Sequence, residues 1–333
     1  MKNKSPSNNE KERIIEEVQK LLEERGRKPL EMARKAILEE EIESKEVKEA
    51  LHYFITEYWH DLARPTLMSI CCEAVGGDPN ATIPFAVPLS LISGALDIQD
   101  DIIDQSKTKH GRPTVYGKYG KEIAILAADA LLFKGFTLLH EAYTEIPKEK
   151  AKKIMKTIKD LFYELGNAEA LELNLRRKPY GTPKEYLYII NKKAGDVEAH
   201  TRIGVIIGGG TEEQELLLGK FGRILGMVII LKDDIEDTLS IEELKHRIEK
   251  EHLPFPIIYY LRSVKPMNIT KKFLNRNLKD IRLTRYIERT QRLINKLVES
   301  ACIYISSSKL ILANRKLELF IKYFSFPTKN IES

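Results

Sequence analysis

Apolar residues recur at spacings of three and four along almost the whole chain, and this period constrains the fold more than any other feature. It starts with Ile14, Val18 and Leu21 and is still present at Leu293 and Leu297. Such spacing places the apolar side chains on one face of a helix. Runs that alternate apolar and polar residues, as strands do, are nearly absent. The sequence therefore predicts an all-α protein.

Length and composition favour one large helical domain. The chain has 333 residues with 43% hydrophobic content, enough to bury a sizeable core, and nothing marks an internal boundary. The first residues are polar and charged without an apolar period. We therefore predict a disordered tail over 1–12 and a single-domain helical bundle over 13–330.

Two short acidic clusters lie inside apolar, helix-like stretches. They read Asp100-Asp101-Ile102-Ile103-Asp104 and Asp233-Asp234-Ile235-Glu236-Asp237, on helices expected at about 82–106 and 212–238. The first and fifth residues of such a cluster lie one turn apart on the same helix face, and the second lies about 100° away. Like charges at this spacing destabilise a helix unless a cation compensates them.

Magnesium is the cation that best suits these clusters. Hard carboxylate oxygens bind Mg²⁺, which is commonly shared with the phosphate oxygens of a substrate. A single cluster of this kind is more often a solvated acidic patch, but two copies in apolar settings favour a metal site on facing helices of a bundle. The predicted metal ligands are all the aspartates of both clusters: Asp100, Asp101, Asp104, Asp233, Asp234 and Asp237.

Further residues around the acidic clusters complete a known pattern. They are the pair Arg64-Pro65, the run from Gly111 to Tyr116, and Lys193 in Asn191-Lys192-Lys193-Ala194-Gly195. Together with the clusters they make the chain resemble the trans-isoprenyl diphosphate synthases over nearly its whole length after the tail. The resemblance implies an all-α isoprenoid synthase fold, usually a homodimer, with a central cavity where three Mg²⁺ ions bind an allylic prenyl diphosphate.

The resemblance also implies roles for individual residues. Asp100 and its neighbours would bind metal from one wall of the cavity and Asp233, with Asp237 as a further candidate, from the other. Lys193 would pair with the diphosphate, so the expected catalytic set is Lys193, Asp100 and Asp233. Lys250 and Lys232 are additional candidates for binding the diphosphate.

The site for the second substrate of the family, isopentenyl diphosphate, departs from the family pattern. Asp61 stands where the family has a phosphate-binding lysine, Ser93 replaces a histidine, and Lys109-His110 replaces a pair of arginines. Neither Lys nor His reproduces the bidentate guanidinium fork. If isopentenyl diphosphate still binds, we expect it to do so through Arg64, Lys109 and Arg112.

Three outcomes of the chemistry stay open. The prenyl cation is transferred to isopentenyl diphosphate or another acceptor; or it is captured by its own double bond or by water, as in terpene synthases; or the chain is a non-catalytic subunit. Leu96 and Ala95 leave no aromatic side chain before the first cluster, which by analogy favours a product of geranylgeranyl size or longer. Asp97 either extends the metal site or forms an ion pair, and we favour the ion pair.

Composition argues against several other classes. A net charge of +5 without a basic, aromatic stripe does not indicate a nucleic-acid-binding protein. Three cysteines give no disulfide framework or metal pair, and there is no secretory signal. The uncharged run 79–96 is broken by Pro84 and Pro88 and falls short of a membrane span. We expect a cytoplasmic protein.

Overall fold

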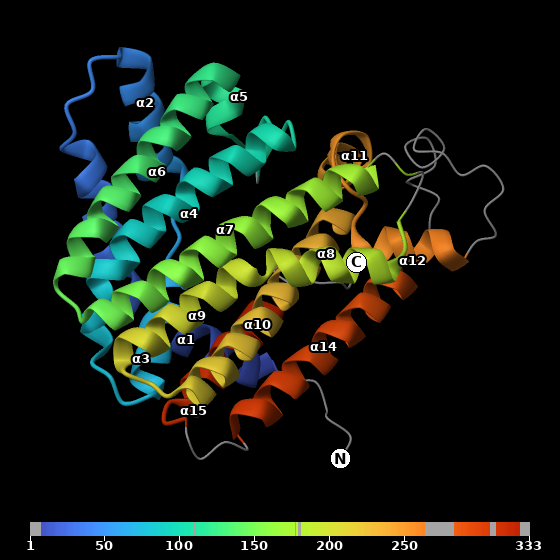
Figure 1. Ribbon diagram of the computed structural model, residues 1–333. Coiled ribbons are helices and arrows are strands. Elements are labelled where there is room, and N and C mark those ends of the chain that lie inside the picture. Colours follow the sequence, from blue (N-terminus) through green and yellow to red (C-terminus); the bar gives the residue numbers. More distant parts are fainter. Residues whose placement is uncertain are drawn as a thin grey trace. The chain divides into compact units, whose positions relative to one another are not determined.

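The structure is a computed structural model that describes residues 8–109, 111–176, 178, 181–263, 283–306 and 311–326 (Figure 1). Helices dominate these ranges, which confirms the all-α prediction. The only strands in the described part of the chain are β1 (Thr108–Lys109) and β2 (Arg112–Pro113), an antiparallel pair in which Lys109 lies opposite Arg112.

The chain groups into two compact units. The N-proximal unit comprises Gln19–Met155 and Ile203–Gly210, and the C-proximal unit comprises Met1–Val18, Lys156–Arg202 and Thr211–Ser333. The sequence marked no such division, because the chain crosses between the units three times within helices and once at the short turn between Gly210 and Thr211, rather than through long linkers. These helices are α1 (Asn8–Leu38), α7 (Lys148–Arg176) and α9 (Gly195–Gly208). The single domain predicted over 13–330 stays a prediction.

The predicted tail is shorter than expected. Helix α1 begins at Asn8, so residues 8–12 are helical although they were assigned to a disordered tail. The physical reason is that Glu10, Lys11 and Glu12 have high helix propensity and extend the helix beyond its first apolar residue. Residues 1–7 lie outside the described residues.

The N-proximal unit is built around two apolar helices that lie side by side, α4 (Ile83–Ile103) and α6 (Lys121–Thr144) (Figure 1). Gly135 allows this close approach, since a Cβ atom there would lie 2.6 Å from the side chain of Ile92. The remaining elements of this unit are α2 (Lys45–Tyr53), the π-helix η1 (Phe54–Tyr58), α3 (Ala63–Ala74), the 3-10 helix η2 (Pro79–Thr82) and α5 (Val115–Tyr119).

In the C-proximal unit, α10 (Glu212–Leu239) packs against α14 (Thr284–Ser306). A capping box starts α10, because the Thr211 hydroxyl accepts from the backbone N–H of Gln214 and the Gln214 side chain accepts from that of Thr211. The other helices of this unit are α8 (Pro183–Lys193), α11 (Ile241–Lys250), α12 (Phe255–Ser263) and α15 (Asn314–Ser325).

Two segments are long and apolar enough to cross a membrane by length and composition, Pro79–Ile103 and Lys121–Thr144. Burial in the protein core accounts for the apolar composition of the first segment, which is 72% buried. The second segment is 33% buried. Core helices of globular proteins also have this composition. The first segment is a longer helix than its prolines indicated, since Pro84 lies in the first turn of α4 and Pro88 is accommodated inside it. The expected absence of a membrane span and the cytoplasmic location stay predictions.

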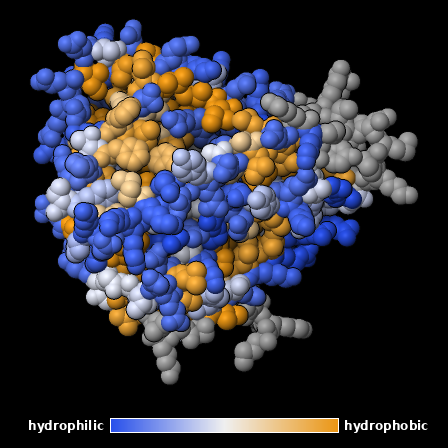
Figure 2. Space-filling view, in the orientation of Figure 1, coloured by the Kyte–Doolittle hydropathy of each residue, from blue (hydrophilic) through white to orange (hydrophobic). Residues whose placement is uncertain are grey.

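Part of the apolar surface of α6 is exposed. Ile125, Leu126 and Phe133 keep 40%, 51% and 71% of their surface accessible. Leu126 and Phe133 are seven residues apart and therefore lie on the same helix face. Figure 2 shows apolar side chains gathered over the position of α6, at the upper left of the view.

Candidate active site

The first acidic cluster lies at the carboxyl end of α4. Asp101 and Asp104 are buried and Asp100 is partly exposed. The carboxyl end of a helix carries partial negative charge, which adds to the mutual repulsion of these carboxylates. This end of the helix therefore needs a nearby positive charge.

A tight turn at the end of α4 reverses the chain and allows a positive side chain to lie near these carboxylates. Gln105 takes a left-handed conformation with φ 55°, and the N–H groups of Gln105 and Ser106 donate to the carbonyls of Ile102 and Asp101. This pattern is a Schellman motif, which normally uses glycine at the left-handed position. It ends α4 at Ile103, three residues before the predicted end, and leads the chain into the β1–β2 hairpin.

Lys109 in this hairpin compensates part of the negative charge of the first cluster. Its Nζ lies 2.8 Å from Asp101 Oδ1 and 3.3 Å from Asp100 Oδ2. Burial opposes the charge of Lys109, but Asp100 and Asp101 outweigh burial and hold its pKa well above the ordinary value. The pKa of Asp101 is nevertheless raised to about 6, because burial outweighs the attraction of Lys109. One lysine thus undercompensates the cluster.

The second acidic cluster lies in the last two turns of α10, as predicted. Asp234 is buried, whereas Asp233 is exposed to solvent. Although Asp233 is accessible, desolvation by the protein around it, together with the charges of Glu236 and Asp237, raises its pKa to about 7. A raised pKa means that the negative charge of the carboxylate is unfavourable in its surroundings. Because Asp233 is accessible, a cation that binds there would stabilise this charge.

Asp234 differs from Asp233 because its oxygens are already bound by the protein. Oδ2 accepts from the hydroxyl of Tyr186 at 2.5 Å and from the backbone N–H of Phe255 at 3.2 Å. Oδ1 accepts from Arg247 at 3.0 Å. Burial still raises the pKa of Asp234 to about 6. Both oxygens of Asp234 thus accept hydrogen bonds from the protein, which favours a positioning role. The geometry does not support the metal-binding role predicted for Asp234.

Arg247 on α11 joins the second cluster to the following turn. Its guanidinium donates to Asp237 at 2.6 Å and to Asp234 at 3.0 Å, and its Nε lies 3.1 Å from Glu251. Arg247 is therefore the counterpart of Lys109: one protein cation holds two aspartates of each cluster. Its fork geometry suits paired carboxylates.

The three lysines predicted to bind diphosphate have different surroundings. Lys193 lies 2.8 Å from Glu169 and 2.6 Å from Glu172, both on α7. Lys232 forms a pair with Glu236 at 3.3 Å, one turn later on α10. Lys250 is exposed at the end of α11. Their roles toward a diphosphate stay predictions.

The predicted isopentenyl diphosphate residues lie in acidic or polar contacts within the N-proximal unit. Arg64 pairs with Asp61 at 2.8 Å and with Asp97 at 3.7 Å. Asp61 also accepts from the N–H groups of Ala63 and Arg64, so it caps the start of α3. An acidic residue therefore stands at this position for a local reason: it starts a helix and neutralises Arg64.

Arg112, another residue of that predicted site, lies opposite Lys109 in the β1–β2 hairpin. Arg112 is exposed and donates to the carbonyl of Glu57 at 3.1 Å. Ser93 is buried in α4 with 3% of its surface accessible. His110 lies outside the described residues. For Asp97 the ion-pair interpretation is supported, since it contacts Arg64 and accepts from Trp59 Nε1 at 3.1 Å.

Sequence reasoning missed several residues around the second cluster. Arg247 and Tyr186 contact Asp234, while Glu169 and Glu172 hold Lys193. Only weak signals could have found them. Arg247 follows the cluster on a short amphipathic helix, but Tyr186 lies 48 positions before Asp234 in the sequence. Such pairings are created by packing.

The donor chemistry of both clusters suits Mg²⁺. In the described part of the chain no three His, Cys, Asp or Glu side chains converge into a ready-made metal cage. Each cluster instead combines carboxylate oxygens of raised pKa with few protein cations, Lys109 in the first cluster and Arg247 and Lys232 in the second. Oxygen-only donors that leave room for water are what Mg²⁺ requires. That the two clusters face each other stays a prediction.

Comparison with known proteins shows the family of the chain. The family model for polyprenyl synthetases matches residues 44–291. A short chain isoprenyl diphosphate synthase from Methanothermobacter thermautotrophicus is 33% identical over 54% of this chain and 55% of its own. The heterodimeric geranylgeranyl pyrophosphate synthase large subunit 2 from Arabidopsis thaliana is 31% identical over 71% of this chain and 64% of its own.

The fold agrees with a solved structure of the same kind. The geranylgeranyl pyrophosphate synthetase from Pyrococcus horikoshii aligns with TM-score 0.77 and 26% identity over 95% of this chain and 97% of that one. In sequence, the chain spans little more than half the length of the first relatives, 55% and 58%. The helical fold predicted from the resemblance is confirmed. This chain belongs to the polyprenyl synthetase family.

Proposed function

We propose that the protein is a Mg²⁺-dependent prenyltransferase that ionises an allylic prenyl diphosphate and transfers the prenyl cation to isopentenyl diphosphate. The observation that carries the proposal is the pair of undercompensated acidic clusters, at Asp100–Asp104 and Asp233–Asp237, in a chain of the polyprenyl synthetase family. One relative is named a short chain isoprenyl diphosphate synthase and another a geranylgeranyl diphosphate synthase. A product of geranylgeranyl length is our corresponding proposal.

The residues proposed to hold Mg²⁺ include exposed and buried carboxylates: Asp233 is exposed and Asp100 partly exposed, whereas Asp101 and Asp104 are buried. They are Asp100 and Asp104 with Asp101 in the first cluster, and Asp233 with Asp237 in the second. When bound, Mg²⁺ neutralises the charge that develops on the departing diphosphate. Arg247 keeps Asp237 in a fixed orientation through its contacts with both Asp234 and Asp237. Rigid support of this kind lowers the cost of arranging the ligands.

Lys109 and Lys193 contribute in a second way. Each ammonium group is shared between two carboxylates, Lys109 by Asp100 and Asp101 and Lys193 by Glu169 and Glu172. When substrate and metal bind, a phosphate oxygen can replace the carboxylates beside each lysine, and Mg²⁺ can replace the lysine beside the carboxylates. One set of ion pairs is then exchanged for another at little net cost in free energy. We propose that both lysines turn from carboxylates to the diphosphate when substrate and metal bind.

Terpene formation is the second candidate, and one observation favours it. Arg64, one of the two arginines of the predicted isopentenyl diphosphate site, is paired with Asp61 and Asp97. Two carboxylates beside it weaken attraction for a second diphosphate. Without that acceptor, the cation would be captured by its own double bond or by water. A non-catalytic role in an assembly with another synthase is the third candidate; one relative is named as the large subunit of a heterodimeric enzyme.

One experiment separates the three candidates. The protein is incubated with Mg²⁺ and geranyl, farnesyl or geranylgeranyl diphosphate, with and without isopentenyl diphosphate. Longer diphosphates formed only with isopentenyl diphosphate support chain elongation, whereas hydrocarbons or alcohols formed without it support a terpene synthase. Absence of turnover together with tight binding to a second synthase supports the subunit role.

Variants test the acidic clusters themselves. Asp100→Ala and Asp233→Ala are each expected to abolish Mg²⁺-dependent release of pyrophosphate, because each removes a proposed ligand. Asp160→Ala is the matched control, since Asp160 is an exposed aspartate on α7 whose partners are the exposed Lys156 and Lys159. Undiminished release from both cluster variants would refute a metal-dependent ionisation.

The homodimer expected from the resemblance is also a proposal. The exposed side chains of Leu126 and Phe133 on α6 support it, because an apolar stripe of this kind is commonly covered in an assembly. Phe133→Asp is expected to shift the protein to monomer in sedimentation experiments. Tyr188→Asp, at another exposed aromatic side chain, serves as the control.

A further inference from the structure

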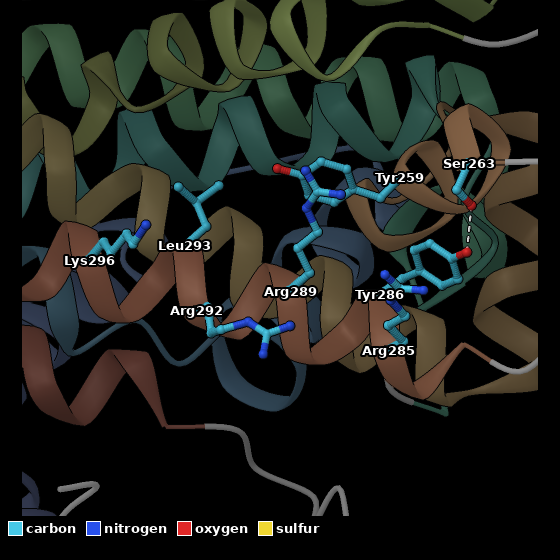
Figure 3. A pocket seen from close by; sticks show the side chains of 8 residues that line it. All are labelled: Tyr259, Ser263, Arg285, Tyr286, Arg289, Arg292, Leu293 and Lys296. Carbon is cyan, nitrogen blue, oxygen red and sulfur yellow. Dashed lines mark hydrogen bonds between the residues drawn. The ribbon is translucent and has the colours of Figure 1, made fainter. Parts of the chain in front are cut away.

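A basic groove lies between α12 and α14, in a part of the C-proximal unit that the proposed prenyl transfer does not use. Its volume is about 520 Å³, within the usual range for small-molecule sites. Four cationic side chains of α14 and two tyrosines contribute to its lining (Figure 3). The lining residues are Tyr259, Ser263, Arg285, Tyr286, Arg289, Arg292, Leu293 and Lys296.

The cations share one face of α14 because of their spacing. Arg289, Arg292 and Lys296 follow Arg285 by four, seven and eleven residues, which returns to the same side of a helix. Such a row of like charges is unfavourable for an isolated helix. Among the described residues, no carboxylate lies within ion-pair distance of any of the four. The positive charge of this groove is therefore not neutralised by any carboxylate of the described residues.

Two contacts organise the groove. The Arg289 guanidinium lies over the ring of Tyr259, 4.2 Å from its centroid (Figure 3). This stacking fixes the guanidinium plane while its N–H groups stay free to donate outward. An arginine held in this way loses less conformational entropy when it binds an anion.

The second contact is a pair of hydroxyls. Ser263 Oγ and Tyr286 Oη lie 2.5 Å apart, and Ser263 also donates to the carbonyl of Tyr260. The Ser263 hydrogen is thereby committed to a carbonyl or to Tyr286. When Ser263 donates to Tyr260, the Tyr286 hydroxyl can donate to Ser263 or to an added acceptor. The eight lining residues offer donors and cations and include no anionic group.

We propose that this groove binds the diphosphate or triphosphate group of a small phosphorylated ligand. Phosphate oxygens accept paired hydrogen bonds from guanidinium forks, and four cations match a group that carries two to four negative charges. Leu293 and the two tyrosine rings leave an apolar part that suits an organic residue attached to the phosphates. The ligand class is shared by free pyrophosphate, nucleoside triphosphates and prenyl diphosphates. The inference does not depend on the proposed prenyl transfer.

Calorimetric titration of the full chain with pyrophosphate in EDTA tests the proposal. Removing divalent metal separates this groove from the acidic clusters, which repel a diphosphate when no metal is present. We expect a dissociation constant below about 1 mM that weakens as salt rises. Arg289→Gln and Arg292→Gln should each weaken binding by about tenfold. Arg262→Gln, an exposed arginine of α12 outside the groove, should leave binding unchanged.

Parallel titrations identify the source of the phosphate group. Tighter binding of a nucleoside triphosphate or of geranylgeranyl diphosphate than of pyrophosphate would assign the organic part. The proposal is overturned if none of the three binds in EDTA, or if both groove variants bind as tightly as the unmodified protein. It is also overturned if binding is seen only to vesicles containing phosphatidylglycerol, which would indicate a membrane contact. Circular dichroism checks that the variants, at exposed positions, keep their helices.

Discussion

Lys109 holds its ammonium nitrogen 2.8 Å from Asp101, so the first acidic cluster carries its own counterion. The helix stop at Gln105 and the β1–β2 hairpin create this contact, because they turn the chain back onto the end of α4. In the second cluster, Arg247 has the same relation to Asp237. Both clusters can therefore exist in the folded protein before any metal binds.

Lys109→Gln should lower stability and increase the response to Mg²⁺. Removing the ammonium leaves Asp101 buried without its counterion, at a cost of about 1–3 kcal/mol in the free energy of unfolding. Mg²⁺ can replace the missing charge, so it should raise the melting temperature of the variant more than that of the unmodified protein. Urea unfolding and thermal melts with and without MgCl₂ measure both effects. Lys107→Gln, at an exposed neighbour, is the control. Equal Mg²⁺ responses would argue against metal binding at this cluster.

Arg247→Met should be among the most destabilising single changes in the chain. It leaves Asp234 and Asp237 without their shared cation, and breaking a buried pair of this kind costs about 3–5 kcal/mol. Arg247→Lys should recover part of the loss, because an ammonium keeps the charge but not the fork. Urea unfolding gives the values. Lys245→Met, at an exposed position of the same helix, should change stability little, and a comparable loss there would contradict the assignment.

The lowered pKa of Glu172 predicts that the free energy of unfolding decreases in acid. Burial opposes its ionisation, but Lys193 outweighs burial and lowers the pKa of Glu172 to about 2, from 4.5. A carboxyl whose pKa is lower in the folded state stabilises the fold above its unfolded pKa and loses this contribution as pH falls. Stability should therefore decline from pH 4.5 toward pH 2, by roughly 3 kcal/mol from this group.

Glu172→Gln checks the assignment of that pH dependence. The variant should be less stable than the unmodified protein at pH 7 and nearly as stable at pH 2, so the two curves of unfolding free energy against pH should converge in acid. Glu149→Gln is a suitable control, because Glu149 is exposed on the same helix and pairs with the exposed Lys152. Parallel curves for Glu172→Gln would show that another group carries the acid transition.

Gln105→Gly should stabilise the protein. Gln105 adopts φ 55°, a left-handed conformation that costs a residue with a Cβ atom about 1 kcal/mol relative to glycine. Glycine should therefore raise the free energy of unfolding by about 0.5–1 kcal/mol. Gln99→Gly makes the same change inside α4, where it should lower stability by about 1 kcal/mol. Thermal melts of both variants test the contrast, and a loss at both positions would contradict it.

The sequence by itself determined the helical class and the two acidic clusters near the ends of α4 and α10. These features follow from local periodicity and from the cost of carboxylates in apolar surroundings, and both can be read from neighbouring residues. The ends were less certain: the Schellman stop at Gln105 was missed because a glutamine gives no turn signal.

Only the tertiary structure decided which charges meet. Tyr186 and Arg247 satisfy Asp234, Glu172 holds Lys193, and Asp61 neutralises Arg64. The groove between α12 and α14 likewise exists only because two helices pack side by side. Partners that are distant in sequence are chosen by packing and by the need to satisfy every buried charge, and a linear pattern carries neither kind of information.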